Sequence, residues 1–399
     1  MNKEARKAFN ESFSTEKYQQ MLVDIQSEFP NDLDFRVAET PVFVDRFLKT
    51  KLLIACNDII DTIQKPNFKE KTDAAIPSQF HFENESEYPE FLAIDFAVCK
   101  DENGELEPQL IELQGFPSLF AYQSYLSGKY KKHFSVPADY SAFFNRLNNF
   151  SYQQEMSRFI KGKDVSKRTV LLEVFPKKQK TRLDFTLSKT YWNIDVVCLT
   201  DLIFENGEVF YLNNDEKTKI DRIYNRIIFD DIERNFPELM HLVENLQSAN
   251  VDWIAHPNWF YRVSKYCMPL IKSKYVPSCI YLNEAKVDEL DLSQYVLKPL
   301  FSFAGAGVKI DVEGSDIEQI ANKSDYLLQQ KVTYEPVIEN PEGVKIKAEI
   351  RLLFIWEAGK LRPKLMTNLA RLSRGKMIGV DYNKDFDWVG GSSAFFETN

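Results

Sequence analysis

Acidic and amide side chains stand in the middle of two apolar segments that are predicted to be strands. Asp95 is the one charged residue on its face of FLAIDFAV, and Glu112 and Gln114 lie two residues apart in PQLIELQGF. Because successive side chains of a strand point to opposite faces, Glu112 and Gln114 share a face. The turn signal DENG between the two segments predicts a hairpin, which places Asp95 and Glu112 on one surface.

Two carboxylates on one surface repel each other and resist desolvation. A Mg²⁺ ion removes both difficulties, since it is commonly bound by one or two carboxylates together with nucleotide phosphates. Asp95, Glu112 and Gln114 are therefore candidate metal ligands. The alternative is a partly exposed sheet face that carries ordinary solvated acids.

A loop that contains glycines follows another apolar strand, in YVLKPLFSFAGAGVKI (295–310). Lys298 ends the strand, Pro299 stops it, and GVKI is predicted to resume a strand after Gly305 and Gly307. Glycines let backbone N–H groups approach phosphates closely, and a lysine at the root of the loop adds a point charge. The spacing matches neither a P-loop nor a Rossmann fingerprint. A glycine-containing hairpin with a lysine that reaches solvent is the alternative.

Two arginines in the last part of the chain could bind an anion. Arg351 shares a strand face with Glu349 in KIKAEIRLLFIW, and Arg371 lies in TNLARLSRG (367–375), which is predicted to be a loop. A guanidinium can hold a phosphate or a carboxylate with two parallel hydrogen bonds. The alternative for Arg351 is a cross-strand ion pair on a solvated face, and a solvated loop is favoured for Arg371.

The composition limits the class of protein. A chain of 399 residues is too long for one compact core, so two or three domains are expected. The net charge of −9 disfavours nucleic-acid and anionic-membrane partners. The sequence has no apolar run near the ~20 residues that span a bilayer, and no secretory signal at its start. Five scattered cysteines without CxxC spacing favour a reducing, cytoplasmic location.

The order of predicted elements indicates an α/β (α+β) architecture. Residues 1–84 have helical spacing, with the pair Thr40–Pro41 as N-cap and first position of a helix. The hairpin and further helical segments occupy 85–165. Buried strands alternate with helices over 166–280, as in a parallel α/β unit, and 281–399 contains strands with long connections.

Together these segments resemble the ATP-grasp superfamily. YVLKPLFSFAGAGVKI resembles its phosphate-binding strand and glycine loop, and DYLLQQKV resembles the strand that leads to the adenine-contacting hinge. The family usually places its metal-binding acid and E-x-N motif after these segments. Here AIDFAV and LIELQGFPSL, which resemble them, lie upstream, an order similar to that of the circularly permuted glutathionylspermidine synthase group. The resemblance covers about residues 85–399.

The resemblance implies a circularly permuted ATP-grasp fold with a Rossmann-like pre-ATP-grasp domain. Residues 85–165 would form the metal-binding part, 166–280 the pre-ATP-grasp domain, and 281–399 the ATP-binding part. The helical N-terminal segment, 1–84, receives no role from the resemblance.

The resemblance also implies the ligands and the residues that bind them. ATP and Mg²⁺ would be bound, with Asp95, Glu112 and Gln114 as metal ligands. Arg351 and Arg371 would be the catalytic arginines that stabilise the transferring phosphoryl group or the acyl oxygen. The implied ATP-binding residues are Lys298, Gly305, Gly307, Lys309, Gln329, Gln330 and Lys331.

The implied activity is an ATP- and Mg-dependent ligation of a small-molecule carboxylate to an amine through an acylphosphate. Two residues depart from the family pattern: Gln114 stands where the family has asparagine, and Asp381 stands near the place of an arginine. Two alternatives therefore stay open: a nucleotide-binding protein without ligase turnover, and a small-molecule phosphotransferase on the same fold. The sequence specifies neither the substrates nor the oligomeric state.

Overall fold

A six-stranded antiparallel sheet lies at the centre of the molecule. The computed structural model describes residues 1–302, 305–376, 378 and 383–398. The central sheet has the strand order β18-β17-β16-β2-β3, with β15 paired to β16. Its strands are β2 (Phe91–Lys100), β3 (Leu106–Gln114), β15 (Ile338–Glu339), β16 (Lys345–Ile355), β17 (Lys364–Ser373) and β18 (Gly390–Ser392).

The predicted hairpin is confirmed, and it pairs with strands from the far end of the chain. β2 and β3 are antiparallel, with Asp95 opposite Glu112. The other edge of β2 pairs with β16, which itself pairs with β17. The segment 367–375 is therefore mostly a strand rather than the predicted loop. β17 pairs with β16 on one edge and with β18 on the other, and the local sequence carries no information about these partners.

A second unit contains the predicted parallel sheet, which is confirmed. The order is β11-β10-β5-β6 and all three pairings are parallel. A small antiparallel sheet, β7-β8-β9, which the sequence analysis did not predict, lies between β6 and β10 in the chain. The strands are β5 (Thr169–Glu173), β6 (Asp195–Cys198), β7 (Ile203–Glu205), β8 (Glu208–Asn213), β9 (Glu216–Ile220), β10 (Arg222–Asn225) and β11 (Asp252–Ile254).

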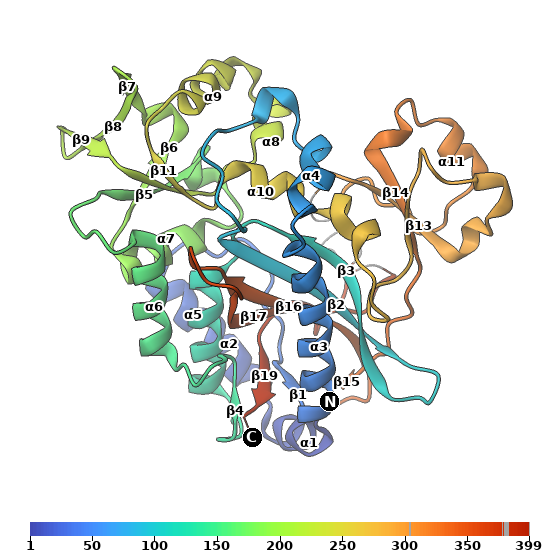
Figure 1. Cartoon of the computed structure of the whole chain (residues 1–399). Coiled ribbons are helices and arrows are strands. Elements are labelled where there is room, and N and C mark those ends of the chain that lie inside the picture. The colour runs from blue at the N-terminus through green and yellow to red at the C-terminus, as the bar shows by residue number, and fades with distance from the viewer. Residues whose placement is uncertain (303–304, 377, 379–382, 399) are drawn as a thin grey trace.

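A third unit is an antiparallel sheet of three strands, which stands apart on the right of Figure 1 together with the short helix α11. Its order is β12-β14-β13, with β12 (Cys279–Tyr281), β13 (Tyr295–Pro299) and β14 (Tyr326–Gln330). The strand predicted for GVKI is reduced to one isolated bridge between Leu297 and Lys309. Gly305 and Gly307 have positive φ, and this left-handed backbone interrupts the extended conformation that a strand needs.

Helices cover the central sheet, and those of the N-terminal segment belong to its core. Buried residues of α1, α2 and α3 join the same hydrophobic cluster as those of β2, β16 and α5. The domain boundaries after residues 84, 165 and 280 stay a prediction. The α-helices are α1 (Lys3–Ser12), α2 (Thr15–Glu28), α3 (Arg46–Ile63), α4 (Phe68–Thr72), α5 (Phe120–His133), α6 (Asn149–Lys161), α7 (Arg182–Trp192), α8 (Phe229–Asn235), α9 (Met240–Gln247), α10 (Pro257–Arg262) and α11 (Gly314–Glu318).

The helix start predicted at Thr40–Pro41 is wrong. Thr40 and Pro41 lead into β1 (Val42–Val44), which pairs in parallel with β19 (Ala394–Glu397) near the other end of the chain. β4 (Tyr140–Ser141) completes this sheet. The helix begins after Asp45, whose side chain accepts a hydrogen bond from the backbone N–H of Leu48. The distant strand partner decides the conformation against the local capping signal.

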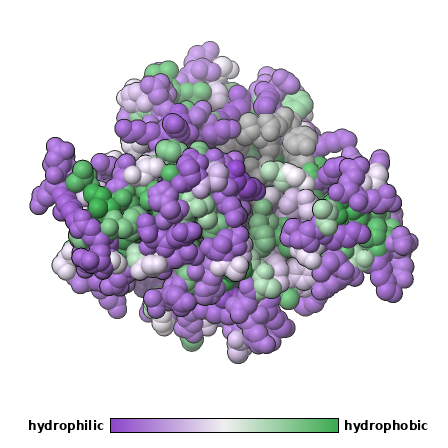
Figure 2. Space-filling model, turned by 90° about the horizontal axis from the view of Figure 1, so that it is seen from above, coloured by the Kyte–Doolittle hydropathy of each residue, from purple (hydrophilic) through white to green (hydrophobic). Residues whose placement is uncertain are grey.

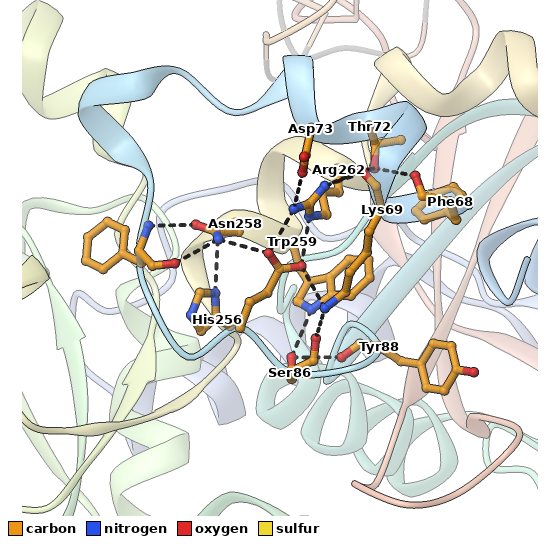
Figure 3. Close-up of polar contacts among 12 residues, drawn as sticks. Phe68, Lys69, Thr72, Asp73, Ser86, Tyr88, His256, Asn258, Trp259 and Arg262 are labelled. Atoms are coloured by element: carbon orange, nitrogen blue, oxygen red, sulfur yellow. Dashed lines mark hydrogen bonds and ion pairs between the residues drawn. The ribbon is translucent and has the colours of Figure 1, made fainter. Parts of the chain in front are cut away.

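A buried polar network fastens the segment 68–90 to α10 (Figure 3). Arg262 binds Glu85 with two prongs, at 2.8 Å (Nε–Oε1) and 3.0 Å (Nη2–Oε2). Its Nη1 donates to the carbonyl of Lys69 at 2.7 Å, and Asn258 Nδ2 donates to Glu85 at 3.0 Å. Burial by itself raises the pKa of Glu85, but the hydrogen bonds from Arg262 and Asn258 hold it below its usual value.

The same helix supports the end of β3. Trp259 Nε1 donates to Ser86 Oγ at 2.8 Å, which holds α10 from the side of the segment 68–90. On the other side, the N–H of Gly115 donates to the carbonyl of Val263 at 2.8 Å. A Cβ atom at Gly115 would lie 2.4 Å from the carbonyl oxygen of Trp259, so only glycine permits this approach.

We expect the substitution Glu85→Ala to lower the free energy of unfolding by about 3 kcal/mol, because it leaves the buried Arg262 guanidinium with only the exposed Asp73 as an acidic partner. Denaturant unfolding followed by circular dichroism measures this change. Glu83→Ala is the matched control, since the Glu83 side chain is exposed and only its carbonyl contacts His256. Equal stability of the two variants would contradict the role of this network.

Candidate active site

Charged side chains from four strands lie on one face of the central sheet. Asp95 on β2 stands opposite Glu112 on β3 and opposite Arg351 on β16. Arg371 on β17 stands opposite Glu349 on β16. The register therefore brings together acids and arginines that lie far apart in the sequence.

Both oxygens of the Asp95 carboxylate are bound by arginines. Asp95 is only 1% exposed, and Arg351 holds it at 2.5 Å (Nε–Oδ1) and 2.6 Å (Nη2–Oδ2). Arg371 Nη2 lies 2.6 Å from Oδ2 and also pairs with Glu349. Arg351 Nη1 donates to Ser118 Oγ at 3.0 Å. Movement of either arginine would leave this buried carboxylate without hydrogen-bond partners, so the network fixes the position of both guanidinium groups.

Glu112 lies at the edge of this network among positive charges. Arg351 Nη2 is 3.6 Å from its Oε1, and Lys265 Nζ is 3.8 Å from its Oε2. Burial by itself raises the pKa of Glu112, but four neighbouring cations outweigh burial and lower it to about 2. Those cations are Lys265, Arg351, Arg371 and Lys298. Glu112 is therefore ionised at neutral pH.

A β-bulge in β3 connects this face to the three-stranded sheet. The pairing of β2 and β3 shifts after Asp95, and Ile111 has no partner in β2. Lys298 Nζ donates to the carbonyl of Ile111 at 2.9 Å, and Gln329 Nε2 donates to that of Leu110 at 2.8 Å. Two predicted ATP-binding residues thus anchor β13 and β14 to the metal-binding hairpin proposed from the sequence. Bulges of this kind often lie beside active sites, where they redirect side chains.

Burial lowers the pKa of Lys298 to about 8, against the opposing effect of the nearby Glu112 carboxylate. Lys298 is only 7% exposed. Its ammonium group is consequently charged at neutral pH and loses its proton in mildly alkaline solution. A partly desolvated cation is well suited to a phosphate, which would replace the lost hydration.

A cavity of about 180 Å³ lies between the polar face and the three-stranded sheet. Figure 2, which looks down on the molecule, shows a strip of pale green residues near the middle with purple residues on both sides and darker green patches farther out. Charged and polar side chains line the cavity together with six aliphatic ones: Ile111, Val296, Val308, Ile310, Val332 and Ile378. The cavity gathers seven residues predicted from the sequence: Glu112, Lys298, Gly305, Gln329, Gln330, Lys331 and Arg371.

The other predicted residues do not line this cavity. Asp95 and Arg351 lie in the buried network beside it. Gly307 packs against Pro299, whose Cγ would lie 2.8 Å from an added Cβ. Lys309 pairs with Asp316 on the surface of the three-stranded unit.

Gln114 lines a smaller cavity next to the main one, together with Glu112 and Lys265. Its Nε2 donates to Glu112 Oε1 at 2.8 Å. Asp381, the second departure from the family pattern, lies outside the described residues, as do residues 303–304 of the glycine loop.

The metal assignment rests on Glu112 and Gln114 more than on Asp95. In the part of the chain that the structure describes, no three His, Cys, Asp or Glu residues are grouped to hold a metal ion. Both oxygens of Asp95 are engaged by arginines. An Mg²⁺ ion that is also bound by phosphates needs only one or two protein ligands, and the ionised Glu112 with the Gln114 carbonyl fits that need. Asp95, Glu112 and Gln114 as metal ligands stay a prediction.

Three cavity residues were missed by the sequence analysis. Lys265 is buried, donates to the carbonyl of Ser302 at 2.8 Å and faces Glu112. Tyr334 donates to Glu349 Oε2 at 2.9 Å, and Lys376 lies at the rim. A lysine inside the apolar run that follows HPNWFYR was the one available signal for Lys265.

No protein-family model matches the sequence, and no curated protein matches it. Among solved structures, the fold is similar to that of a glutathione synthetase-like effector (GSS30) from Globodera pallida in its apo form, with a TM-score of 0.58. The alignment covers 96% of this chain and 98% of that chain at 8% identity. At this identity the likeness concerns the fold alone. The chain has a mixed α/β, glutathione synthetase-like fold, which agrees with the ATP-grasp resemblance at that level.

Proposed function

We propose that the protein is an ATP- and Mg-dependent ligase that joins a small-molecule carboxylate to an amine. The observation that carries the proposal is the convergence of Lys298, Gln329 and Gly305 with Glu112 and Arg371 in one cavity. These residues come from two sheets and from three distant parts of the sequence. Their types match what an ATP-dependent acyl activation requires: cations for phosphates, an acid for a metal, and an apolar slot for a base.

The nucleotide occupies the cavity between the two sheets. Its base lies among the aliphatic side chains beside β14, where Gln330 and Lys331 reach the lining. Its phosphates extend toward Lys298 and the loop at Gly305, where a positive φ lets backbone N–H groups donate hydrogen bonds to phosphate oxygens. The site carries the cations Lys265, Lys298, Arg351 and Arg371 against the acids Asp95, Glu112 and Glu349, so added negative charge is favoured.

The arginines have different tasks. Arg371 lines the cavity, and its Nε is buried without a hydrogen-bond partner among the described residues, so it can donate to a transferring phosphoryl group. Arg351 is committed to Asp95 and Ser118 and holds the acids in place. Glu112 and Gln114 would hold Mg²⁺, which when bound neutralises part of the phosphate charge.

The reaction proceeds in two displacements. An oxygen of the substrate carboxylate attacks the γ-phosphorus of ATP, the bond to the β-phosphate oxygen breaks, and ADP leaves with an acylphosphate remaining. The amine nitrogen then attacks the acyl carbon, loses a proton and expels inorganic phosphate to form an amide. Alignment of the reactants and electrostatic stabilisation of the transferring group supply most of the rate gain in such transfers.

The order of the segments supports a permuted ATP-grasp arrangement of the glutathionylspermidine synthase type. The hairpin β2–β3 with its candidate metal ligands precedes the nucleotide-binding strands in the chain, yet it joins β16 and β17 in one sheet. Sheet completion by an upstream hairpin is the feature expected of a permuted chain.

We expect Lys298→Ala to reduce ATP affinity roughly tenfold to a hundredfold, because a charged hydrogen-bond donor to phosphate is lost. Isothermal titration with Mg·ATP measures the affinity. Lys323→Ala is the control, since Lys323 is exposed in the same unit and does not line the cavity. Unchanged ATP affinity in the Lys298 variant would contradict nucleotide binding in this cavity.

We expect sustained ADP release over many turnovers to require both a carboxylate and an amine, and to be abolished by Glu112→Ala. A coupled ADP assay over pools of acids and amines measures turnover. Mg·ATP binding without acid-dependent ADP release would favour a nucleotide-binding protein without turnover, and a stable phosphorylated product without amine would favour a phosphotransferase. Wild-type Mg·ATP affinity in the Glu112 variant would contradict its metal assignment.

We expect ATP affinity to fall roughly tenfold between pH 7 and pH 9, because Lys298, with a pKa of about 8, is protonated below that pH and neutral above it. The sign follows from the loss of a positive charge that holds phosphate as the pH rises. In Lys298→Arg the decline should vanish, because a guanidinium stays charged throughout this range. A decline of equal size in both proteins would show that another group titrates.

A further inference from the structure

A groove of about 860 Å³ lies on a different part of the molecule, beside α1. Its other walls are the tip of the β2–β3 hairpin and the segment 335–341. Asn10 Nδ2 donates to the carbonyl of Glu339 at 2.8 Å, which ties α1 to that segment, and Figure 1 shows α1 and β15 at the lower edge of the molecule. The groove shares no lining residue with the nucleotide cavity. Its volume is that of a typical small-ligand site.

The charges in the groove do not cancel. Each of its three acids is paired with a lysine: Glu11 with Lys7, Glu335 with Lys100, and Glu339 with Lys345. Of the remaining cations, the Met1 ammonium group pairs with Asp45, whereas Lys3 and Arg6 have no carboxylate partner in the part of the chain that the structure describes. The groove is therefore a region of excess positive charge.

Arg6 is a cation held in place without a counter-charge. Its Cζ lies 5.2 Å from the ring centres of both Phe9 and Phe43. Nη1 donates to Thr40 Oγ1 at 2.5 Å and Nη2 donates to the carbonyl of Pro41 at 2.6 Å. A guanidinium has five N–H groups, so three remain beyond these two bonds. Burial without an acid lowers the pKa of Arg6 to about 9, which agrees with an uncompensated charge.

A further polar atom of the lining lacks a partner. Asn340 is 2% exposed, and its Oδ1 accepts the backbone N–H groups of Glu342 and Val344. Its Nδ2 has no hydrogen-bond partner among the described residues. Buried polar groups are almost always satisfied, so a buried amide donor without a partner beside the groove is unusual.

We propose that this groove binds a small polyvalent anion through Arg6 and Lys3. The ligand carries carboxylate or phosphate groups, because these are the anions that a guanidinium binds with paired hydrogen bonds. It is bound separately from the nucleotide, so the proposal does not depend on the function proposed above.

Citrate and inorganic pyrophosphate serve as the carboxylate and phosphate probes, each titrated calorimetrically into the full chain carrying Lys298→Ala. We expect at least one probe to bind at one site per chain. Adding Lys3→Glu or Arg6→Gln should weaken binding roughly tenfold or more, as the loss of a charged contact predicts. Lys163→Glu is the matched control, since Lys163 is exposed elsewhere and the change in net charge equals that of Lys3→Glu. The stronger probe identifies the anionic group.

Three results would overturn the proposal. They are failure of both probes to bind, equal binding by the Lys3→Glu and Lys163→Glu proteins, and binding that is present in the otherwise unaltered chain but lost on Lys298→Ala alone, which would place the anion in the nucleotide cavity. Because Lys3 is exposed, Lys3→Glu remains informative even if Arg6→Gln lowers stability, which thermal unfolding measures.

Discussion

The buried Asp95 carboxylate, held between Arg351 and Arg371, is the interaction on which the rest of the candidate site depends. It joins three neighbouring strands, β2, β16 and β17, at the level of their side chains. The carboxylate is 1% exposed, so movement of the guanidinium groups would leave it buried without hydrogen-bond partners, which is strongly unfavourable. The network thus holds the guanidinium groups of Arg351 and Arg371 in fixed positions beside Glu112. Such preorganised positive charge is what stabilises negative charge on a transferring phosphoryl group.

The cavity proposed to bind a nucleotide lies where the two sheets meet at the β3 bulge. The unpaired residue of the β3 bulge presents its carbonyl to Lys298, and the carbonyl before it binds Gln329. A regular hairpin would direct these carbonyl groups into its own ladder, so the bulge is what lets the three-stranded unit dock here. Lys265 also approaches Glu112, from the segment that follows α10. The Arg262–Glu85 network supports that segment.

Local sequence patterns predicted much of this arrangement. Alternation along FLAIDFAV and PQLIELQGF gave the hairpin and the shared surface of Asp95 and Glu112, and glycine spacing located the loop beside Lys298. The same kind of reasoning failed at Thr40–Pro41, where a distant strand partner overrides a capping signal, and at Arg371, whose predicted loop is strand β17. The sequence pattern also did not predict the direction of the Lys309 side chain, which pairs with Asp316 and does not line the cavity.

The sequence by itself determined which groups could carry the chemistry: the acids, the amide, the root lysine, the glycines and the arginines, each placed on a strand or loop by short-range periodicity. Only the tertiary structure decided what those groups do to one another. It engaged Asp95 with arginines, lowered the pKa of Glu112, and added Lys265 from a segment with no motif. The physical reason is that charge, burial and cavity shape depend on contacts between segments far apart in the chain, and periodicity carries no information about those contacts.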